Sequence, residues 1–179
     1  MNTNDDGLVI VYTGAGKGKT TAALGLCLRA VGHGNKVGLI QFIKSDWPYG
    51  EMESLKQLRP EVEVMILGAG CIGIMGDDKP IEEHRQAARM ALVEAQQAVL
   101  SDRFDVLILD EINIAVHLGL FEVDEVCDLI ASRPKRLDLV LTGRQADPKI
   151  IALADLVTEM KEIKHPFASG RMSKKGIDH

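Results

Sequence analysis

The sequence predicts an α/β protein in which a mainly parallel sheet of about six strands lies between two layers of helices. Strand-like apolar runs alternate with helical patterns along the chain, an order typical of parallel sheets covered on both faces. Two of these runs are almost unbroken in Val, Ile and Leu, as expected for strands buried on both sides. No repeat, low-complexity tract or linker interrupts the 179 residues, so one domain over residues 1–179 is expected.

Six runs have the length and composition of strands. The first is short, β-branched and nearly uncharged, and the second and fourth have nearly continuous apolar centres. The predicted strands are Leu8–Thr13, Lys36–Ile43, Val62–Leu67, Asp105–Asp110, Leu137–Thr142 and Asp155–Ile163.

Four stretches between these runs carry helical patterns. The first continues without Gly-Pro punctuation until Gly32-His33-Gly34. The predicted helices are Lys19–Val31, Pro80–Ser101, Val123–Ser132 and Pro148–Leu153.

A glycine-rich loop, Thr13-Gly14-Ala15-Gly16-Lys17-Gly18-Lys19-Thr20-Thr21, joins the first strand to the first helix. Its glycines let backbone N–H groups turn toward one centre, and the helix N-terminus adds partial positive charge. Lys19 would reach the terminal phosphates of a nucleotide, and the Thr20 hydroxyl would ligate Mg²⁺. Thr13 replaces the first glycine of the usual pattern, but three glycines remain to form the cradle. The loop predicts a nucleoside triphosphate site in a P-loop (RecA-like) three-layer fold.

A second nucleotide-site signal is the apolar strand that ends in Asp110 and Glu111. Behind a phosphate loop, Asp110 is predicted to be a carboxylate on the magnesium side of the site. Glu111 has two interpretations: it polarises water, as in hydrolysing NTPases, or it binds the metal or a second substrate.

Basic residues near strand ends are candidates for neutralising the triphosphate. Besides the loop lysines they are Arg29, Lys44 and Arg144. The guanidinium of Arg144, after the fifth strand, would clamp phosphate bidentately, the alternative being a solvated surface arginine.

The loops after Thr13, Asp110 and Thr142 are expected to meet, because ligands of such sheets bind beyond the carboxyl ends of the strands. The irregular loop from Gly68 to Asp78 is rich in glycine and apolar residues. It is either a mobile lid over a hydrophobic ligand or a plain surface connection.

Composition excludes several classes of function. A net charge of −5 and 4% aromatic residues give no reason to expect nucleic-acid binding. The apolar runs are too short to cross a bilayer, and the polar N-terminus is unlike a signal peptide, so a cytoplasmic location is expected. Cys27, Cys71 and Cys127 predict no disulfide framework or thiolate metal site, and Cys27 and Cys127 fall on apolar helical faces as small buried hydrophobes.

Further segments share a specific order and spacing. They are Arg29-Ala30-Val31-Gly32-His33-Gly34, Gln41-Phe42-Ile43-Lys44, Trp47-Pro48 with Gly50-Glu51, Leu109-Asp110-Glu111, Thr142-Gly143-Arg144, and Lys164-His165-Pro166-Phe167 with Gly170 and Gly176-Ile177-Asp178. Together with the phosphate loop and its Thr13, they resemble the corrinoid adenosyltransferases of the cob(I)yrinic acid a,c-diamide type. The resemblance runs from about Gly7 to the C-terminus.

The resemblance implies an ATP:cob(I)alamin or corrinoid adenosyltransferase of cobalamin biosynthesis or salvage. In such enzymes a Co(I) corrinoid attacks the ribose C5′ carbon of ATP and expels inorganic triphosphate. It also implies a homodimer and a flavoprotein reductant, with the Gly68–Asp78 loop and Trp47 as walls of an apolar corrinoid site.

The resemblance also implies roles for individual residues. Catalytic roles fall to Lys19, Glu111 and Arg29, and contacts to Mg²⁺ or Mn²⁺ to Thr20, Asp110 and Glu111. ATP is expected to bind Gly14, Ala15, Gly16, Lys17, Gly18, Lys19, Thr20, Thr21, Gln41, Lys44 and Arg144.

Two other functions stay open on the residues alone. One is a P-loop ATP hydrolase in which Glu111 polarises water and Arg144 senses phosphate. The other is a nucleotide-dependent switch module without turnover. The product separates the first from the transferase, because hydrolysis gives ADP and phosphate whereas adenosyl transfer gives triphosphate.

Overall fold

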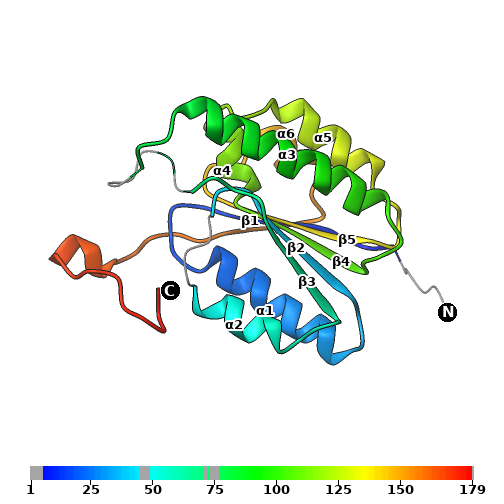
Figure 1. Ribbon diagram of the computed structural model, residues 1–179, viewed down its shortest axis with the longest axis horizontal. Coiled ribbons are helices and arrows are strands. Elements are labelled where there is room, and N and C mark those ends of the chain that lie inside the picture. The colour runs from blue at the N-terminus through cyan, green and yellow to red at the C-terminus, as the bar shows by residue number, and fades with distance from the viewer. Residues whose placement is uncertain (1–5, 45–48, 71, 73–76, 179) are drawn as a thin grey trace.

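A computed structural model describes residues 6–44, 49–70, 72 and 77–178. Six parallel strands form one sheet in the order β3-β2-β4-β5-β1-β6. Helices α1 and α2 lie on one face of the sheet, and α3, α5 and α6 lie on the other (Figure 1). The strands are β1 Val9–Thr13, β2 Val37–Gln41, β3 Val62–Ile66, β4 Val106–Asp110, β5 Asp138–Thr142 and β6 Leu156–Glu159.

The helices are α1 Lys19–Gly32, α2 Gly50–Lys56, α3 Ile81–Leu100, α4 Ile112–His117, α5 Val123–Ser132 and α6 Pro148–Leu153, followed by a 3₁₀ turn, η1, at Pro166–Ser169. The predicted three-layer α/β fold and the four predicted helices are confirmed, with bounds that differ by at most one residue at each end. No helix among the described residues is long and apolar enough to span a membrane.

The core is divided in two by the sheet. Strand β4 is buried along its whole length, and its side chains alternate between the two halves. Leu107 and Leu109 pack in the cluster under α3 and α5, whereas Val106 and Ile108 pack in the cluster under α1 and α2. This burial on both faces explains the unbroken apolar run in the sequence.

Two short helices and the last strand differ from the prediction. The sequence predicts no helix over α2 or α4, because each is only seven or six residues long and shows little periodicity. The last strand was expected over Asp155–Ile163 but ends at Glu159. There the chain leaves the sheet, because the backbone of Met160 bonds to the glycine-rich loop instead.

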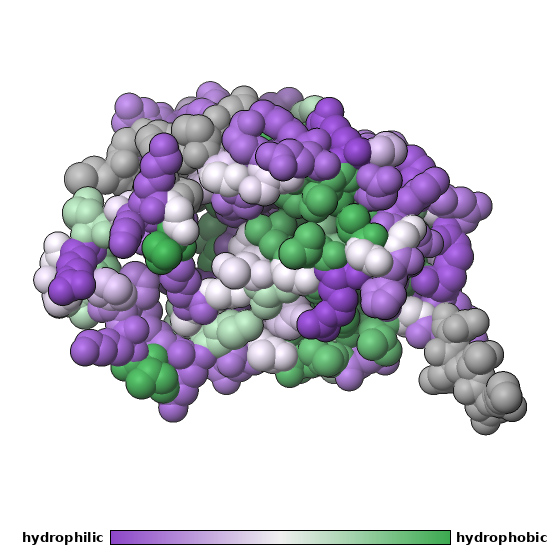
Figure 2. All heavy atoms as spheres, turned by 90° about the horizontal axis from the view of Figure 1, so that it is seen from below, coloured by the Kyte–Doolittle hydropathy of each residue, from purple (hydrophilic) through white to green (hydrophobic). Residues whose placement is uncertain are grey.

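The face seen from below Figure 1 has hydrophobic side chains gathered near its middle and hydrophilic ones around much of its rim (Figure 2). The edge strand β6 exposes its side chains along its length; Leu156 and Val157 are 41% and 42% exposed. Because all the strands are parallel, the loops after β1, β4 and β5 lie at one edge of the sheet.

Candidate active site

The glycine-rich loop is held in shape by backbone contacts with the segment that follows β6. The Gly16 N–H donates to the Met160 carbonyl at 2.6 Å, and the Met160 N–H donates to the Thr13 carbonyl at 2.8 Å. Gly14 has a φ of +97°, and a Cβ there would lie 2.5 Å from the Met160 carbonyl oxygen. Only glycine fits so close an approach in that conformation.

Thr13 stands where the usual motif has glycine, and its side chain connects the loop to a second segment of the chain. Its hydroxyl accepts a hydrogen bond from the Ala146 N–H at 3.1 Å. That bond joins the end of β1 to the segment just after Arg144. The departure from the usual motif therefore adds an anchor between two of the three loops that meet at this edge.

Lys19 lies buried across the inside of the loop. Its Nζ donates to the carbonyl of Gly14 at 2.8 Å and to that of Gly16 at 2.7 Å. Burial lowers the pKa of Lys19, and the attraction of the carboxylate of Glu111 opposes that shift. The ammonium is thus placed among backbone groups that face the phosphate cradle.

Asp110 is fully buried at the end of β4, and both of its carboxylate oxygens are engaged. Oδ1 accepts from the Thr20 hydroxyl at 2.9 Å and from the Thr142 hydroxyl at 2.8 Å. Oδ2 accepts from the Gln41 side-chain amide at 3.1 Å and lies 3.4 Å from Lys44 Nζ. Four side chains therefore hold one carboxylate in a single orientation.

Lys44 joins this network to α2. Its Nζ lies 3.3 Å from Glu51 Oε1, besides its ion pair with Asp110. Burial alone would lower the pKa of Lys44, but the two carboxylates raise it above its ordinary value. Lys44 therefore carries its positive charge across the neutral pH range.

Glu111 adopts a backbone conformation that is uncommon for a residue with a side chain. Its φ is +65°, in the left-handed region, and its N–H donates to the Thr142 hydroxyl at 2.9 Å. Burial and the neighbouring Asp110 raise the pKa of the Glu111 carboxyl, whereas Lys19, Lys44 and Arg144 oppose the rise.

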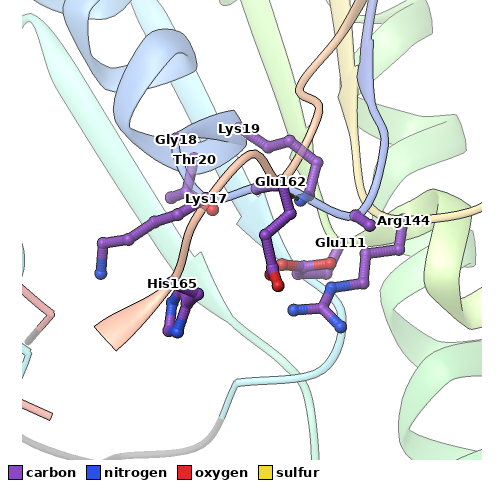
Figure 3. Close-up of a pocket in the computed structure, with 10 residues that line it drawn as sticks. Lys17, Gly18, Lys19, Thr20, Glu111, Arg144, Glu162 and His165 are labelled. Carbon is purple, nitrogen blue, oxygen red and sulfur yellow. Dashed lines mark hydrogen bonds between the residues drawn. The ribbon is translucent and has the colours of Figure 1, made fainter. Parts of the chain in front are cut away.

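A cavity opens in front of the loop, as Figure 3 shows. Glu111, Glu162 and Arg144 converge on one side of it, while Lys17 and His165 lie on the other. Its lining residues are Ala15, Gly16, Lys17, Gly18, Lys19, Thr20, Glu111, Arg144, Glu162 and His165. The structure thus brings the loop, the end of β4 and the loop after β5 to one site, as the sequence predicts.

Glu162 and His165 were missed as site residues. Both belong to the segment after β6; Glu162 lies within the longer strand that the sequence predicted, and His165 lies just beyond it. The ring of His165 accepts a hydrogen bond on Nδ1 from the Phe167 N–H at 3.2 Å. The Lys164-His165-Pro166-Phe167 segment was the signal in the sequence, although it carried no assigned role. The same C-terminal segment supplies Asp178, which pairs with the Lys17 ammonium.

Arg29 is not part of this site. It lies exposed in the last turn of α1, ten residues after Lys19, or about 15 Å along the helix at 1.5 Å per residue. Arg29 therefore does not line this cavity, and the catalytic role expected of its guanidinium stays a prediction. Thr21 faces a neighbouring cleft that it shares with Gly50, Glu51 and residues 176–178.

Part of the predicted corrinoid wall lies outside the described residues, namely Trp47, Cys71 and residues 73–76. The described start of the Gly68–Asp78 loop packs against the segment after β2. There the Gly70 N–H donates to the Ile43 carbonyl at 3.0 Å.

Solved structures share the fold at low sequence identity. The flagellar accessory protein FlaH from Methanocaldococcus jannaschii matches with a TM-score of 0.54 and 16% identity, over 86% of this chain and 71% of that one. A KaiC-like protein from Pyrococcus horikoshii also gives 0.54, with 14% identity over 97% of this chain and 76% of that one. These likenesses support the P-loop fold alone.

Sequence relatives are much closer. The chain is 38% identical to the corrinoid adenosyltransferase of Escherichia coli K12 over 98% of its own length and 87% of the relative's. It is 38% identical to the corrinoid adenosyltransferase of Salmonella typhimurium over 97% and 86% of the two chains, and 36% identical to that of Pseudomonas aeruginosa over 98% and 85%. The family model described as ATP:corrinoid adenosyltransferase BtuR/CobO/CobP matches residues 5–179. The chain therefore belongs to the ATP:corrinoid adenosyltransferase family.

Proposed function

We propose that this protein transfers the 5′-deoxyadenosyl group of ATP to the Co(I) centre of a corrinoid and releases triphosphate. The observation that carries the proposal is family membership over residues 5–179 combined with a well-formed phosphate site. In the reaction an electron pair of Co(I) attacks C5′, the C5′–O bond breaks, and triphosphate leaves with the bonding pair. Cobalt becomes formally Co(III) in the alkyl product.

The residues of the loop suit this leaving group. Triphosphate gains negative charge as the C5′–O bond breaks, and fixed donors at that place stabilise the transition state more than the ground state. Lys19, the loop N–H groups and the N-terminus of α1 supply such donors. Arg144 lines the same cavity and adds a planar guanidinium.

The donor set also fits a hard divalent cation. The Thr20 hydroxyl donates its proton to Asp110, so its lone pairs stay free to face Mg²⁺. Asp110 already accepts three hydrogen bonds and pairs with the Lys44 ammonium, so we assign it to orienting Thr20. Bound Mg²⁺ would neutralise charge on the triphosphate oxygens.

We extend the proposal to substrate and partners. The names of the relatives support a corrinoid substrate, and we propose cob(I)yrinic acid a,c-diamide as the natural one, with a flavoprotein as reductant in the cytoplasm. We also propose a homodimer, as the resemblance to the family implies.

The test is an anaerobic reaction of the purified protein with Mg-ATP and chemically reduced cob(I)alamin or cob(I)yrinic acid a,c-diamide. We expect a light-sensitive alkylcobalt spectrum and one triphosphate per corrinoid. Release of ADP and phosphate without a cobalt–carbon bond would contradict the proposal and favour an ATP hydrolase. A faster reaction with the diamide would support it as the natural substrate.

A further inference from the structure

Thr142, the last residue of β5, has a fully buried hydroxyl with two partners. It donates its single proton to Asp110 Oδ1 at 2.8 Å and accepts the Glu111 N–H at 2.9 Å. A threonine hydroxyl has one proton to donate, and Thr142 gives it to the last residue of β4 while it accepts from the N–H of the next residue. Among the described side chains, no other forms hydrogen bonds to both Asp110 and Glu111.

The hydrogen bond from the Glu111 N–H to Thr142 lies at a residue with an unfavourable backbone conformation. Glu111 has a φ of +65°, a sparsely populated conformation for a residue with a side chain. Such conformations persist where surrounding contacts hold them in place. Here the Thr142 hydroxyl accepts the hydrogen bond from the Glu111 N–H and so stabilises the turn. The turn also ends β4 and starts α4, so it sets the direction in which the Glu111 carboxylate enters the cavity.

The chain leaves β5 through a junction that allows Thr142 little movement. Gly143 has a φ of +131°, and a Cβ there would lie 2.8 Å from the Ile114 backbone nitrogen. The Gly143 N–H donates to the Tyr12 carbonyl of β1 at 3.2 Å. The hydroxyl is therefore held between the strand that precedes the phosphate loop and the strand that carries the two acids.

The bond to Asp110 completes a chain of contacts to the phosphate loop. Thr142 and Thr20 donate to the same oxygen of Asp110, and Thr20 belongs to the phosphate loop. A shift of the carboxylate would also move the Thr20 hydroxyl, which is the proposed metal ligand.

We propose that Thr142 is a positioning residue for Mg-ATP. Its hydroxyl holds Asp110 in the orientation that Thr20 requires, and it holds the left-handed turn that aims Glu111 into the cavity. The inference rests on the proposed Mg-ATP site, and it gives the last residue of β5 a role in that site beside that of Arg144 in the following loop.

The test compares Thr142→Val, which keeps the shape but removes the hydroxyl, with Thr142→Ser, which keeps the hydroxyl. Thr158→Val makes the same chemical change on β6, at an exposed position outside the site, and serves as the matched control. ATP binding is measured by calorimetry with Mg²⁺ and with a chelator, and corrinoid adenosylation is followed over a range of Mg²⁺ concentrations.

We expect Thr142→Val to lose about 10–100-fold in kcat and to need about tenfold more Mg²⁺ for half-saturation, a range typical of residues that orient metal ligands. Its affinity for ATP in chelator should stay within about twofold of the starting protein, because the phosphate loop itself is unchanged. Thr142→Ser should recover most of both losses, and Thr158→Val should behave as the starting protein.

Two results would overturn the inference. One is a Thr142→Val protein whose Mg²⁺ requirement and kcat match those of Thr158→Val. The other is a folded Thr142→Ser protein as impaired as Thr142→Val, which would mean that side-chain volume matters and the hydroxyl does not. If the starting protein forms no alkylcobalt product, the proposed function fails, but the Mg²⁺-dependent part of the ATP affinity still decides the role of Thr142.

Discussion

The ammonium of Lys19 donates to two carbonyls of the phosphate loop, so replacing Lys19 by alanine removes a positive charge from the buried side of the loop. We expect Lys19→Ala to lower kcat by at least about 100-fold, the cost of removing one preorganised donor from a developing oxyanion. Initial rates of alkylcobalt formation at saturating Mg-ATP measure the loss. Lys149→Ala removes an exposed lysine that pairs with Asp124, and it should leave the rate unchanged. Equal rates for the two variants would contradict the role given to Lys19.

Cys27 is confirmed as a small buried hydrophobe on α1, whereas Cys127 is only partly buried. Burial raises the pKa of the Cys27 thiol above its ordinary value, so less reactive thiolate is present at any pH than in the unfolded chain. The unfolded thiol ionises first as pH rises, so the free energy of unfolding should fall as pH rises through the unfolded pKa toward the folded one.

Alkylation mapped by mass spectrometry tests the state of Cys27. At pH 8 we expect Cys27 to react at least about tenfold more slowly in the native protein than in denaturant, because reactivity follows thiolate content and access. Cys127, exposed in part, should react faster than Cys27 in the native protein. A native Cys27 that reacts as fast as the denatured one would mean that α1 does not cover it.

Alanine substitutions at Gly14 in the phosphate loop and at Gly25 in α1 are expected to change the stability of the protein in opposite directions. Gly25 is in the interior of α1 with open space around its Cα, so Gly25→Ala should stabilise the protein by about 0.5–1 kcal/mol and raise Tm by about 1–4 °C. Gly14→Ala should lower Tm and weaken ATP binding about tenfold or more, because a Cβ would meet the Met160 carbonyl in a left-handed conformation. Thermal unfolding and calorimetry of both variants check the pair, and similar effects would show that the loop relaxes around the added methyl group.

Elements with a strong period or motif were predictable from the sequence, and elements set by tertiary contacts were not. The phosphate loop and the acidic end of β4 are local patterns, and the parallel topology then requires that they meet. The short helices α2 and α4 are too brief to show a period. The end of β6 is set by two backbone bonds of Met160 to a loop more than 140 residues away in the chain, which no local pattern encodes.

The site residues divide in the same way, into those found from local sequence patterns and those placed only by tertiary contacts. Asp110, Lys19 and Thr20 were found through spacing. In the structure the Thr20 hydroxyl donates to Asp110, and the neighbouring Lys19 donates to the loop carbonyls of Gly14 and Gly16. Arg29 was assigned from a matching segment, but the rise of α1 carries it away from the cavity. Glu162 and His165 reach the cavity only because the chain turns back after β6.

At the scale of the whole molecule, the site joins parts of the chain that are distant in sequence. The loop after β1, the ends of β4 and β5 and the segment after β6 all line the cavity, so a nucleotide bound there contacts groups that separate on unfolding. A ligand that binds only the folded state stabilises it by about 2.7 kcal/mol at a free concentration 100 times Kd.

For a chain of this length we therefore expect saturating Mg-ATP to raise Tm by about 5–10 °C. ATP with a chelator should give a smaller rise, because the Thr20 hydroxyl then has no cation to bind. Differential scanning calorimetry at increasing nucleotide concentrations measures both shifts, with Lys19→Ala as the variant expected to lose most of the rise. If Mg-ATP left Tm unchanged while calorimetric titration still showed binding, the nucleotide would be contacting a part of the chain that does not hold the sheet together. The cavity in front of the phosphate loop would then not be its site.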